Sequence, residues 1–207
     1  MKVVPLNKEV VPLGRKLYIS DCHFGHDNVI RFDDRPFVNK ENMDKLMIRL
    51  WNENVAPQDD VYILGDMFWY TAKNATKILR QLNGNLHIVK GNHDDWFNAE
   101  NKKLVNEIQD YKEVKDGDYK VILSHYPIIL NRGHRQPSFV HLFGHVHTTW
   151  EELEVARQRK SAMENVASLG QSYNVGAILP YMQFIPRELS WIMEHGEERW
   201  NELNKLI

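Results

Sequence analysis

Five short apolar runs in this 207-residue sequence each end in a cluster of polar side chains. The runs have the length of buried strands, and the clusters are rich in aspartate, asparagine and histidine. Because the end of a strand is rigid, side chains placed there keep fixed separations. The five clusters lie at residues 21–23, 65–66, 91–94, 124–125 and 144–147. This repetition constrains the fold more strongly than any single motif.

The segments between the first three runs predict two amphipathic helices. In residues 43–55 and 72–82, apolar side chains recur at helical spacing. Strands and helices therefore alternate with short connections, which predicts right-handed crossovers and a largely parallel sheet. Ligand sites in such sheets form at the carboxyl ends of the strands, and that is where the polar clusters lie.

The chain is expected to form a single domain over residues 1–207, because no internal linker or repeat interrupts it. Asp116-Gly117-Asp118 predicts a hairpin turn. The highly charged segment 151–173 predicts a solvated helix or a surface excursion, with a lid or an oligomer contact as alternatives. The other expected elements are an edge strand or hairpin arm in 1–13, a helix around 97–108, a last strand near 182–185 and a closing helix that begins at Pro186.

Composition limits the function classes. The formal net charge is −2, so the chain has no global basic field that would attract nucleic acid. Cys22 is the single cysteine, which excludes an internal disulfide and fits a reducing compartment. No run of about 18 apolar residues is present, so we expect no membrane span. We therefore expect a cytoplasmic protein without a membrane partner, and its oligomeric state stays open.

The polar clusters favour a metal site. Carboxylates and imidazoles buried without partners would each cost several kcal/mol, and bound cations remove that cost. Mixed Asp, His and Asn ligands suit manganese, iron, zinc or nickel, whereas calcium prefers oxygen ligands alone. Asp21 and His23 stand two residues apart, so they point to the same side of an extended backbone. The same holds for His145 and His147, whereas Cys22 points away and is expected to be buried.

The five clusters together resemble the five sequence blocks of the calcineurin-like metallophosphoesterase superfamily. In this chain the blocks read Asp21-x-His23, Gly65-Asp66, Gly91-Asn92-His93-Asp94, Ser124-His125 and Gly144-His145-x-His147. Two further stretches also match. His23-Phe24-Gly25-His26, followed by Arg35-Pro36-Phe37, resembles a small bacterial and phage branch of the family. Asn174-Val175-Gly176 resembles the asparagine–glycine segment that often follows the five blocks. The resemblance implies an α/β fold, namely a four-layer αββα sandwich of two mixed β-sheets flanked by helices.

The resemblance also implies two divalent transition-metal ions. Manganese is expected first, with iron, zinc or nickel as alternatives. The implied ligands are Asp21, His23 and His147 for one ion, Asn92, His125 and His145 for the other, and Asp66 as the bridge between them. The resemblance leaves His93 outside this set, as a histidine that binds no metal and faces the substrate.

The activity implied by the resemblance is hydrolysis of a phosphodiester, or of a phosphomonoester, of a small and nucleotide-like substrate. A hydroxide that bridges the two ions would attack phosphorus, and His93 would assist the leaving group. Candidates for substrate contact are Asn28, Arg35 and His134, of which the last two lie in loops that follow the polar clusters.

One position departs from the family pattern. Many members carry an acidic residue three positions after the bridging aspartate, and it orients the catalytic histidine. This chain has Trp69 at that position. His93 is therefore expected to be oriented by a backbone carbonyl or by Asp94.

Two other functions remain open on this fold. Nucleases share these blocks, but the net charge of −2 and the lack of an added DNA-binding domain disfavour nucleic acid as the substrate. A non-catalytic scaffold that binds proteins is a second alternative. It is disfavoured because this chain retains all the implied ligands and His93.

Overall fold

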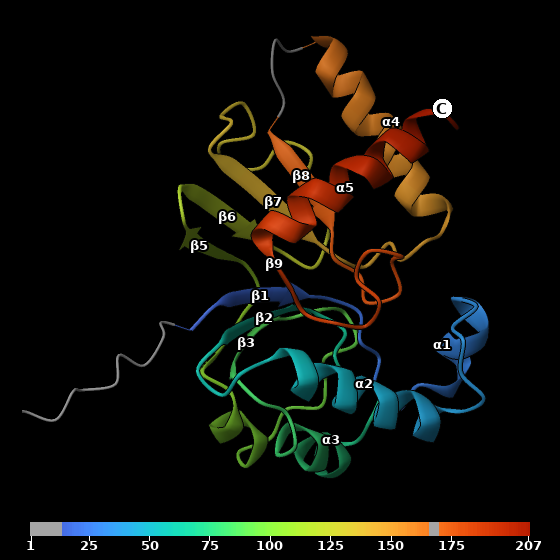
Figure 1. Ribbon diagram of the computed structural model, residues 1–207, viewed down its shortest axis with the longest axis vertical. Coiled ribbons are helices and arrows are strands. Elements are labelled where there is room, and N and C mark those ends of the chain that lie inside the picture. Colours follow the sequence, from blue (N-terminus) through green and yellow to red (C-terminus); the bar gives the residue numbers. More distant parts are fainter. Residues whose placement is uncertain (1–13, 166–169) are drawn as a thin grey trace, which may run out of the picture.

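The computed structural model describes residues 14–165 and 170–207, so the strand expected in residues 1–13 lies outside the described part. The molecule has four layers (Figure 1). Helices α2 and α3 lie against the first sheet, the second sheet lies beyond it, and α4 and α5 form the outermost layer (Figure 1). The expected αββα sandwich is confirmed.

The first sheet has five strands in the order β4-β3-β2-β1-β9. Its first four strands are parallel, as the alternation of strands and helices predicts, and β9 pairs antiparallel with β1. The strands are β1 (Lys16–Ile19), β2 (Asp60–Leu64), β3 (Asn85–Val89), β4 (Glu107–Gln109) and β9 (Arg187–Glu188).

The second sheet has four strands in the order β5-β6-β7-β8. The predicted hairpin is confirmed, since β5 and β6 pair antiparallel around Gly117, whose φ is +55°. The other neighbours, β6 with β7 and β7 with β8, are parallel. The strands are β5 (Lys112–Asp116), β6 (Tyr119–Leu123), β7 (Phe139–Phe143) and β8 (Gln171–Asn174).

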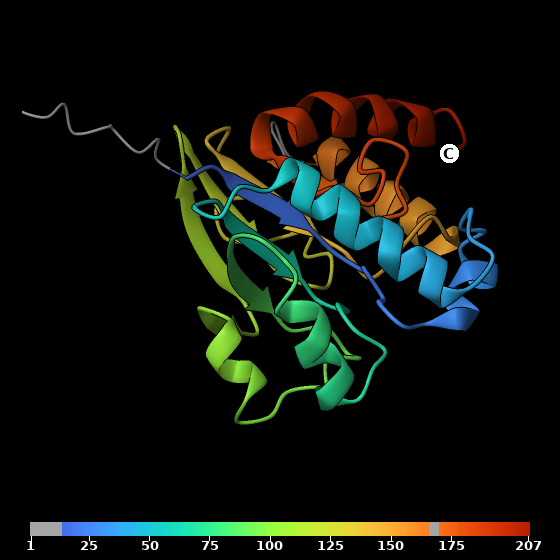
Figure 2. The same cartoon turned by 60° about the horizontal axis from the view of Figure 1, so that its bottom comes forward.

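The helices place their apolar faces on these sheets. In α2, the Asn39 side chain accepts the N–H of Asn42 as an N-cap, and Met43, Met47 and Trp51 are buried along one stripe. Figure 2 shows α5 along the top of the view with α4 next to it. The helices are α1 (Asp27–Phe32), α2 (Lys40–Asn54), α3 (Ala72–Leu79), α4 (Trp150–Asn165) and α5 (Leu189–Asn204), with a 3₁₀ turn η1 (Asn101–Leu104).

Three expected elements are corrected. The helix around 97–108 is only the single turn η1, and Ile108 belongs to strand β4. The strand near 182–185 is a turn, in which Gln183 and Phe184 have positive φ angles that a strand excludes. Pro186 does not begin the closing helix, because β9 comes first and α5 starts at Leu189.

The charged segment after residue 150 is a helix with one buried face. Ala156 of α4 clusters with Trp200 and Leu203 of α5. Glu152 is buried and forms an ion pair with Arg199, at 2.6 Å. The segment is therefore docked on α5, and is not solvated all round. None of the described helices combines the length and the apolar character needed to cross a membrane.

The carboxyl ends of the parallel strands of both sheets meet at the junction between the two sheets. The Ser20 N–H donates to the Val175 carbonyl at 2.9 Å, and the Ser20 carbonyl accepts from the Ala177 N–H at 2.8 Å. The end of β1 is thus joined to the segment that follows β8. The polar clusters after β1, β2, β3, β6 and β7 consequently gather at the junction of the two sheets.

The buried His141 of β7 is expected to make stability depend on pH. Its Nε2 accepts the Ile128 N–H at 3.0 Å and its Nδ1 lies 3.2 Å from the Ile122 carbonyl, and burial lowers its pKa from 6.5 to about 4. Between these two pH values the unfolded chain binds a proton that the native protein does not. The free energy of unfolding should therefore fall with decreasing pH over that interval, by about 3 kcal/mol.

Urea unfolding between pH 7 and pH 4 tests this contribution. The His141→Gln variant keeps an acceptor for Ile128 but does not titrate, so its stability should fall less steeply than that of the wild type. The same pH slope in both proteins would contradict the expectation.

Candidate metal centre

The backbone is strained where the polar clusters lie. Eight described residues other than glycine have a positive φ. Such conformations cost on the order of 1 kcal/mol each and concentrate at functional sites. Five of the eight belong to the polar clusters, with φ angles from 48° to 71°: Asp21, His23, Asp66, His145 and His147.

Two glycines allow the backbone to approach the carboxylates. A Cβ on Gly91 would lie 2.2 Å from Asp66 Oδ1, and a Cβ on Gly144 would lie 2.4 Å from Asp21 Oδ2. The residues beyond them donate to the same carboxylates. The main-chain N–H of His93 donates to Asp66 and that of His145 donates to Asp21, each at 2.9 Å.

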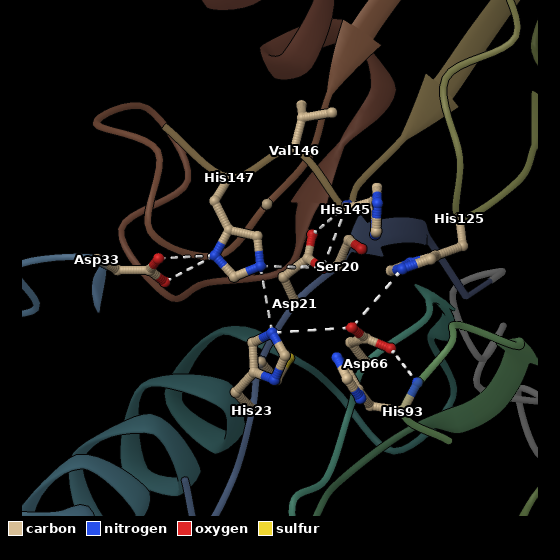
Figure 3. Close-up of polar contacts among 12 residues, drawn as sticks. Ser20, Asp21, His23, Asp33, Asp66, His93, His125, His145, Val146 and His147 are labelled. Atoms are coloured by element: carbon tan, nitrogen blue, oxygen red, sulfur yellow. Dashed lines mark hydrogen bonds and ion pairs between the residues drawn. The ribbon is translucent and has the colours of Figure 1, made fainter. Parts of the chain in front are cut away.

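A first group of possible ligands consists of Asp21, His23 and His147. Their ligand atoms lie within 4.8 Å of one another. The Nε2 atoms of the two histidines face each other at 3.2 Å, and His147 Nε2 lies 3.7 Å from Asp21 Oδ1 (Figure 3).

The Asp66 carboxylate connects this group to a second one. Its Oδ2 atom lies 3.9 Å from His23 Nε2 and 3.7 Å from His125 Nε2 (Figure 3). Asp21, Asp66 and His125 also form a group with ligand atoms within 4.8 Å, so Asp21 belongs to both groups. Asn92 Oδ1 lies 3.0 Å from His125 Nε2, and the His145 ring is centred 5.0 Å from the His125 ring.

The donor set fits divalent cations. Burial, together with the charge of Arg35, lowers the pKa of His23 well below its usual value, so its imidazole is neutral. Burial raises the pKa of Asp66, and the nearby Asp21 adds to the effect. The buried His23 Nδ1 has no hydrogen-bond partner among the described residues. Neutral imidazoles and crowded carboxylates are the ligands that borderline divalent metals bind.

A carboxylate fixes the orientation of His147. Both oxygens of Asp33 lie 2.8 Å from His147 Nδ1, so this nitrogen carries the proton and Nε2 keeps its lone pair for a metal (Figure 3). Asp33 in turn accepts from Arg35, at 2.9 Å. Asp33 is not among the site residues predicted from the sequence, because it stands in a charged loop 114 positions before its partner.

The family follows from comparison with known proteins. The model of the calcineurin-like phosphoesterase superfamily domain matches residues 16–177, which include every polar cluster. The chain belongs to the calcineurin-like phosphoesterase superfamily. The family and the ligand groups together imply that this phosphoesterase domain binds divalent metal.

Relatives of this phosphoesterase domain include proteins without a known function. An uncharacterized protein of Methanocaldococcus jannaschii is 38% identical over 116 residues, which are 55% of this chain and 60% of that protein. A protein of unknown function from Aquifex aeolicus has a crystal structure that superposes with a TM-score of 0.63 at 24% identity, over 94% of this chain and all of that one. The Pseudomonas putida nuclease MPE matches at a TM-score of 0.41 and 19% identity, over 66% of this chain and 63% of that one.

The predicted substrate contacts of the phosphoesterase domain need correction at two positions. The Arg35 side chain is 0% exposed, and its guanidinium donates to the carbonyls of Asp21 and Cys22, so it braces the site from below. The His134 carbonyl accepts from the N–H of Gly170, just before β8, and therefore lies at the end of the sheet opposite the site. Asn28 is exposed on α1, and its role stays a prediction.

Asp94 does not orient His93. Its carboxylate accepts the main-chain N–H groups of Asp66, Met67 and Gly91, at 2.8 to 3.1 Å. The Asp94 carboxylate therefore connects the segment that follows strand β2 to the segment that follows strand β3. Asp94 Oδ1 also accepts the indole N–H of Trp96 at 2.7 Å, so both of its oxygens are occupied by other donors.

The asparagine–glycine segment also supports the site. Asn174 donates from Nδ2 to the His147 carbonyl at 2.9 Å and accepts the Gly176 N–H at 3.0 Å. It thus holds the strained His147 backbone in place. Cys22 is buried, as expected.

The Asp33→Asn variant of the phosphoesterase domain should bind metal about 10- to 100-fold more weakly. Asparagine keeps the shape of the side chain but loses the charge that holds His147 Nδ1–H. Calorimetric titration of metal-stripped protein with Mn²⁺ measures the affinity. Asp34→Asn, at the exposed neighbouring position, is the matched control and should bind as the wild type does. Unchanged affinity in Asp33→Asn would contradict the role given to Asp33.

Proposed function

We propose that the protein is a dinuclear metal-dependent phosphoesterase that hydrolyses a phosphodiester of a small, nucleotide-like substrate. The observation that carries the proposal is the position of Asp66. Its carboxylate lies between His23 and His125, within 4 Å of both, and so can serve two ions at once. The ligand set is the one that the family resemblance implies: Asp21, His23 and His147 for one ion, Asn92, His125 and His145 for the other, and Asp66 for both.

The side chains of the chain have distinct tasks in this reaction. When bound, two divalent cations supply positive charge to the phosphate oxygens and activate a water molecule for attack. His93 is exposed beside the ligands, and its main-chain N–H is fixed on Asp66. From that position its imidazole donates a proton to the leaving oxygen.

An exposed aromatic ring supports a nucleotide-like substrate. Tyr126 is 49% exposed, with its hydroxyl 3.5 Å from Asn92 Oδ1. Trp69 is 46% exposed but packs on His26 and His93, with ring centroids 4.1 and 4.6 Å away, so the base contact is assigned to Tyr126. Aromatic side chains stack on nucleobases whatever the base identity.

Metal-stripped protein tests the proposal. Matched generic phosphodiester and phosphomonoester substrates are incubated after Mn²⁺, Ni²⁺, Zn²⁺ or Mg²⁺ is added singly. We expect metal-restored cleavage with a preference for the diester. Preference for the monoester would change the substrate class but keep the site.

Two further outcomes would overturn parts of the proposal. Salt-dependent cleavage of DNA or RNA with no cleavage of small diesters would identify the protein as a nuclease. Two bound ions without hydrolysis of any ester would favour a non-catalytic scaffold.

A further inference from the structure

The His93 ring has an aromatic neighbour where a charged one is expected. Within residues 14–165 and 170–207 no hydrogen-bond partner contacts the imidazole. The rings that lie near it are Trp69, centred 4.6 Å away at 62°, and His23, centred 6.3 Å away. Trp69 meets His93 in an edge-to-face arrangement, which is a preferred geometry for aromatic pairs.

Trp69 is itself held on two sides. Its indole stacks on the ring of His26, with centroids 4.1 Å apart and planes inclined by 9°. Its main-chain N–H donates to the Phe24 carbonyl at 2.8 Å, next to the bridge between Phe24 and Phe68. The indole is therefore held in a fixed orientation, although the residue is 46% exposed.

We propose that Trp69 is the positioning residue of His93, and that it directs the imidazole at the leaving oxygen by packing alone. The carboxylate of Asp94, the charged alternative expected from the sequence, is occupied by main-chain N–H groups and by the indole N–H of Trp96. The inference rests on the proposed function, because it concerns the group that protonates the leaving oxygen. His26 supports the arrangement from the other face of the indole.

A pair of diesters separates this role from a general structural one. Both share one retained group, but one has a nitrophenol leaving group and the other an alkyl alcohol. A proton donor matters far more for the alkyl alcohol, which leaves poorly as an anion. Replacement of the positioning residue should therefore slow the two reactions unequally.

The holoenzyme of Trp69→Leu should lose about tenfold or more in kcat on the alkyl ester. Its KM and its rate on the nitrophenyl ester should change by less than about twofold, and Trp69→Phe should recover most of the rate. Trp191→Leu is the matched control, because Trp191 also stacks on a histidine, His195, with centroids 3.8 Å apart on α5. It should leave both rates unchanged. Equal losses on both esters, or a change in KM alone, would overturn the proposal.

A second readout does not depend on turnover. In metal-free protein the indole ring current should displace the His93 ring-proton resonance, and Trp69→Leu should move that resonance while the His195 resonance stays in place. An unmoved His93 resonance would overturn the contact. If wild-type protein hydrolyses neither ester with any metal, the proposed function itself fails, whatever the resonance shows.

Discussion

The His93→Ala variant is expected to lose about 10²- to 10⁴-fold in kcat while it still binds both metal ions. The side chain is exposed and its ring has no place in either ligand group, so its removal leaves the donor set intact. Only its main-chain N–H contacts Asp66, and alanine retains that group. The measurements are steady-state kinetics on a diester with an alkyl leaving group, which needs the proton donor, and the metal content of the same sample.

His195→Ala serves as the control, because this histidine lies on α5, and its contacts among the described residues are with Trp191 one turn earlier, to its carbonyl and to its ring. It should keep full activity. Loss of metal from His93→Ala would make His93 a ligand, and full activity would remove it from the reaction.

Asp66→Asn should lower the affinity for both ions by about 100-fold or more. Loss of a partner that only hydrogen-bonds to a ligand costs about 10- to 100-fold in metal affinity, and loss of a carboxylate that itself binds both ions should cost more. The metal-free variant should be as stable as the wild type, or more stable. Asparagine removes a buried negative charge that lies beside Asp21 in the absence of cations. Metal titration and thermal unfolding of the metal-free proteins measure the two effects.

Asp95→Asn, an exposed change near the same site, is the matched control and should alter neither quantity. If Asp66→Asn loses the affinity of one ion only, Asp66 is not the bridge. A large loss of stability in the metal-free variant would show that Asp66 serves the fold instead.

The sequence predicted the features that depend on local periodicity. The helix of residues 43–55 and the parallel strands follow from apolar spacing, and the polar clusters follow from the points where those strands end. The carboxyl ends of parallel strands share one edge of a sheet, so Asp21, His23 and Asp66 had to lie near one another.

The predictions that failed concern residues whose positions are determined by tertiary contacts. Asp33 becomes a partner of His147 only because a loop after α1 returns to the end of β7. Arg35 and His134 have side chains of the kind that bind phosphate, which is why the sequence suggested them as substrate contacts. Their positions, however, depend on the paths of the two loops that contain them, and these paths place both side chains away from the substrate. Near residue 183, two positive φ angles replace an apolar strand pattern by a turn.

The most direct test of the central claim is a stepwise titration of metal-stripped protein with Mn²⁺, with bound metal and diester hydrolysis measured at each addition. The shared position of Asp66 predicts that two equivalents bind and that hydrolysis rises only as the second site fills. Full activity at one equivalent, or activity without metal, would contradict a dinuclear centre.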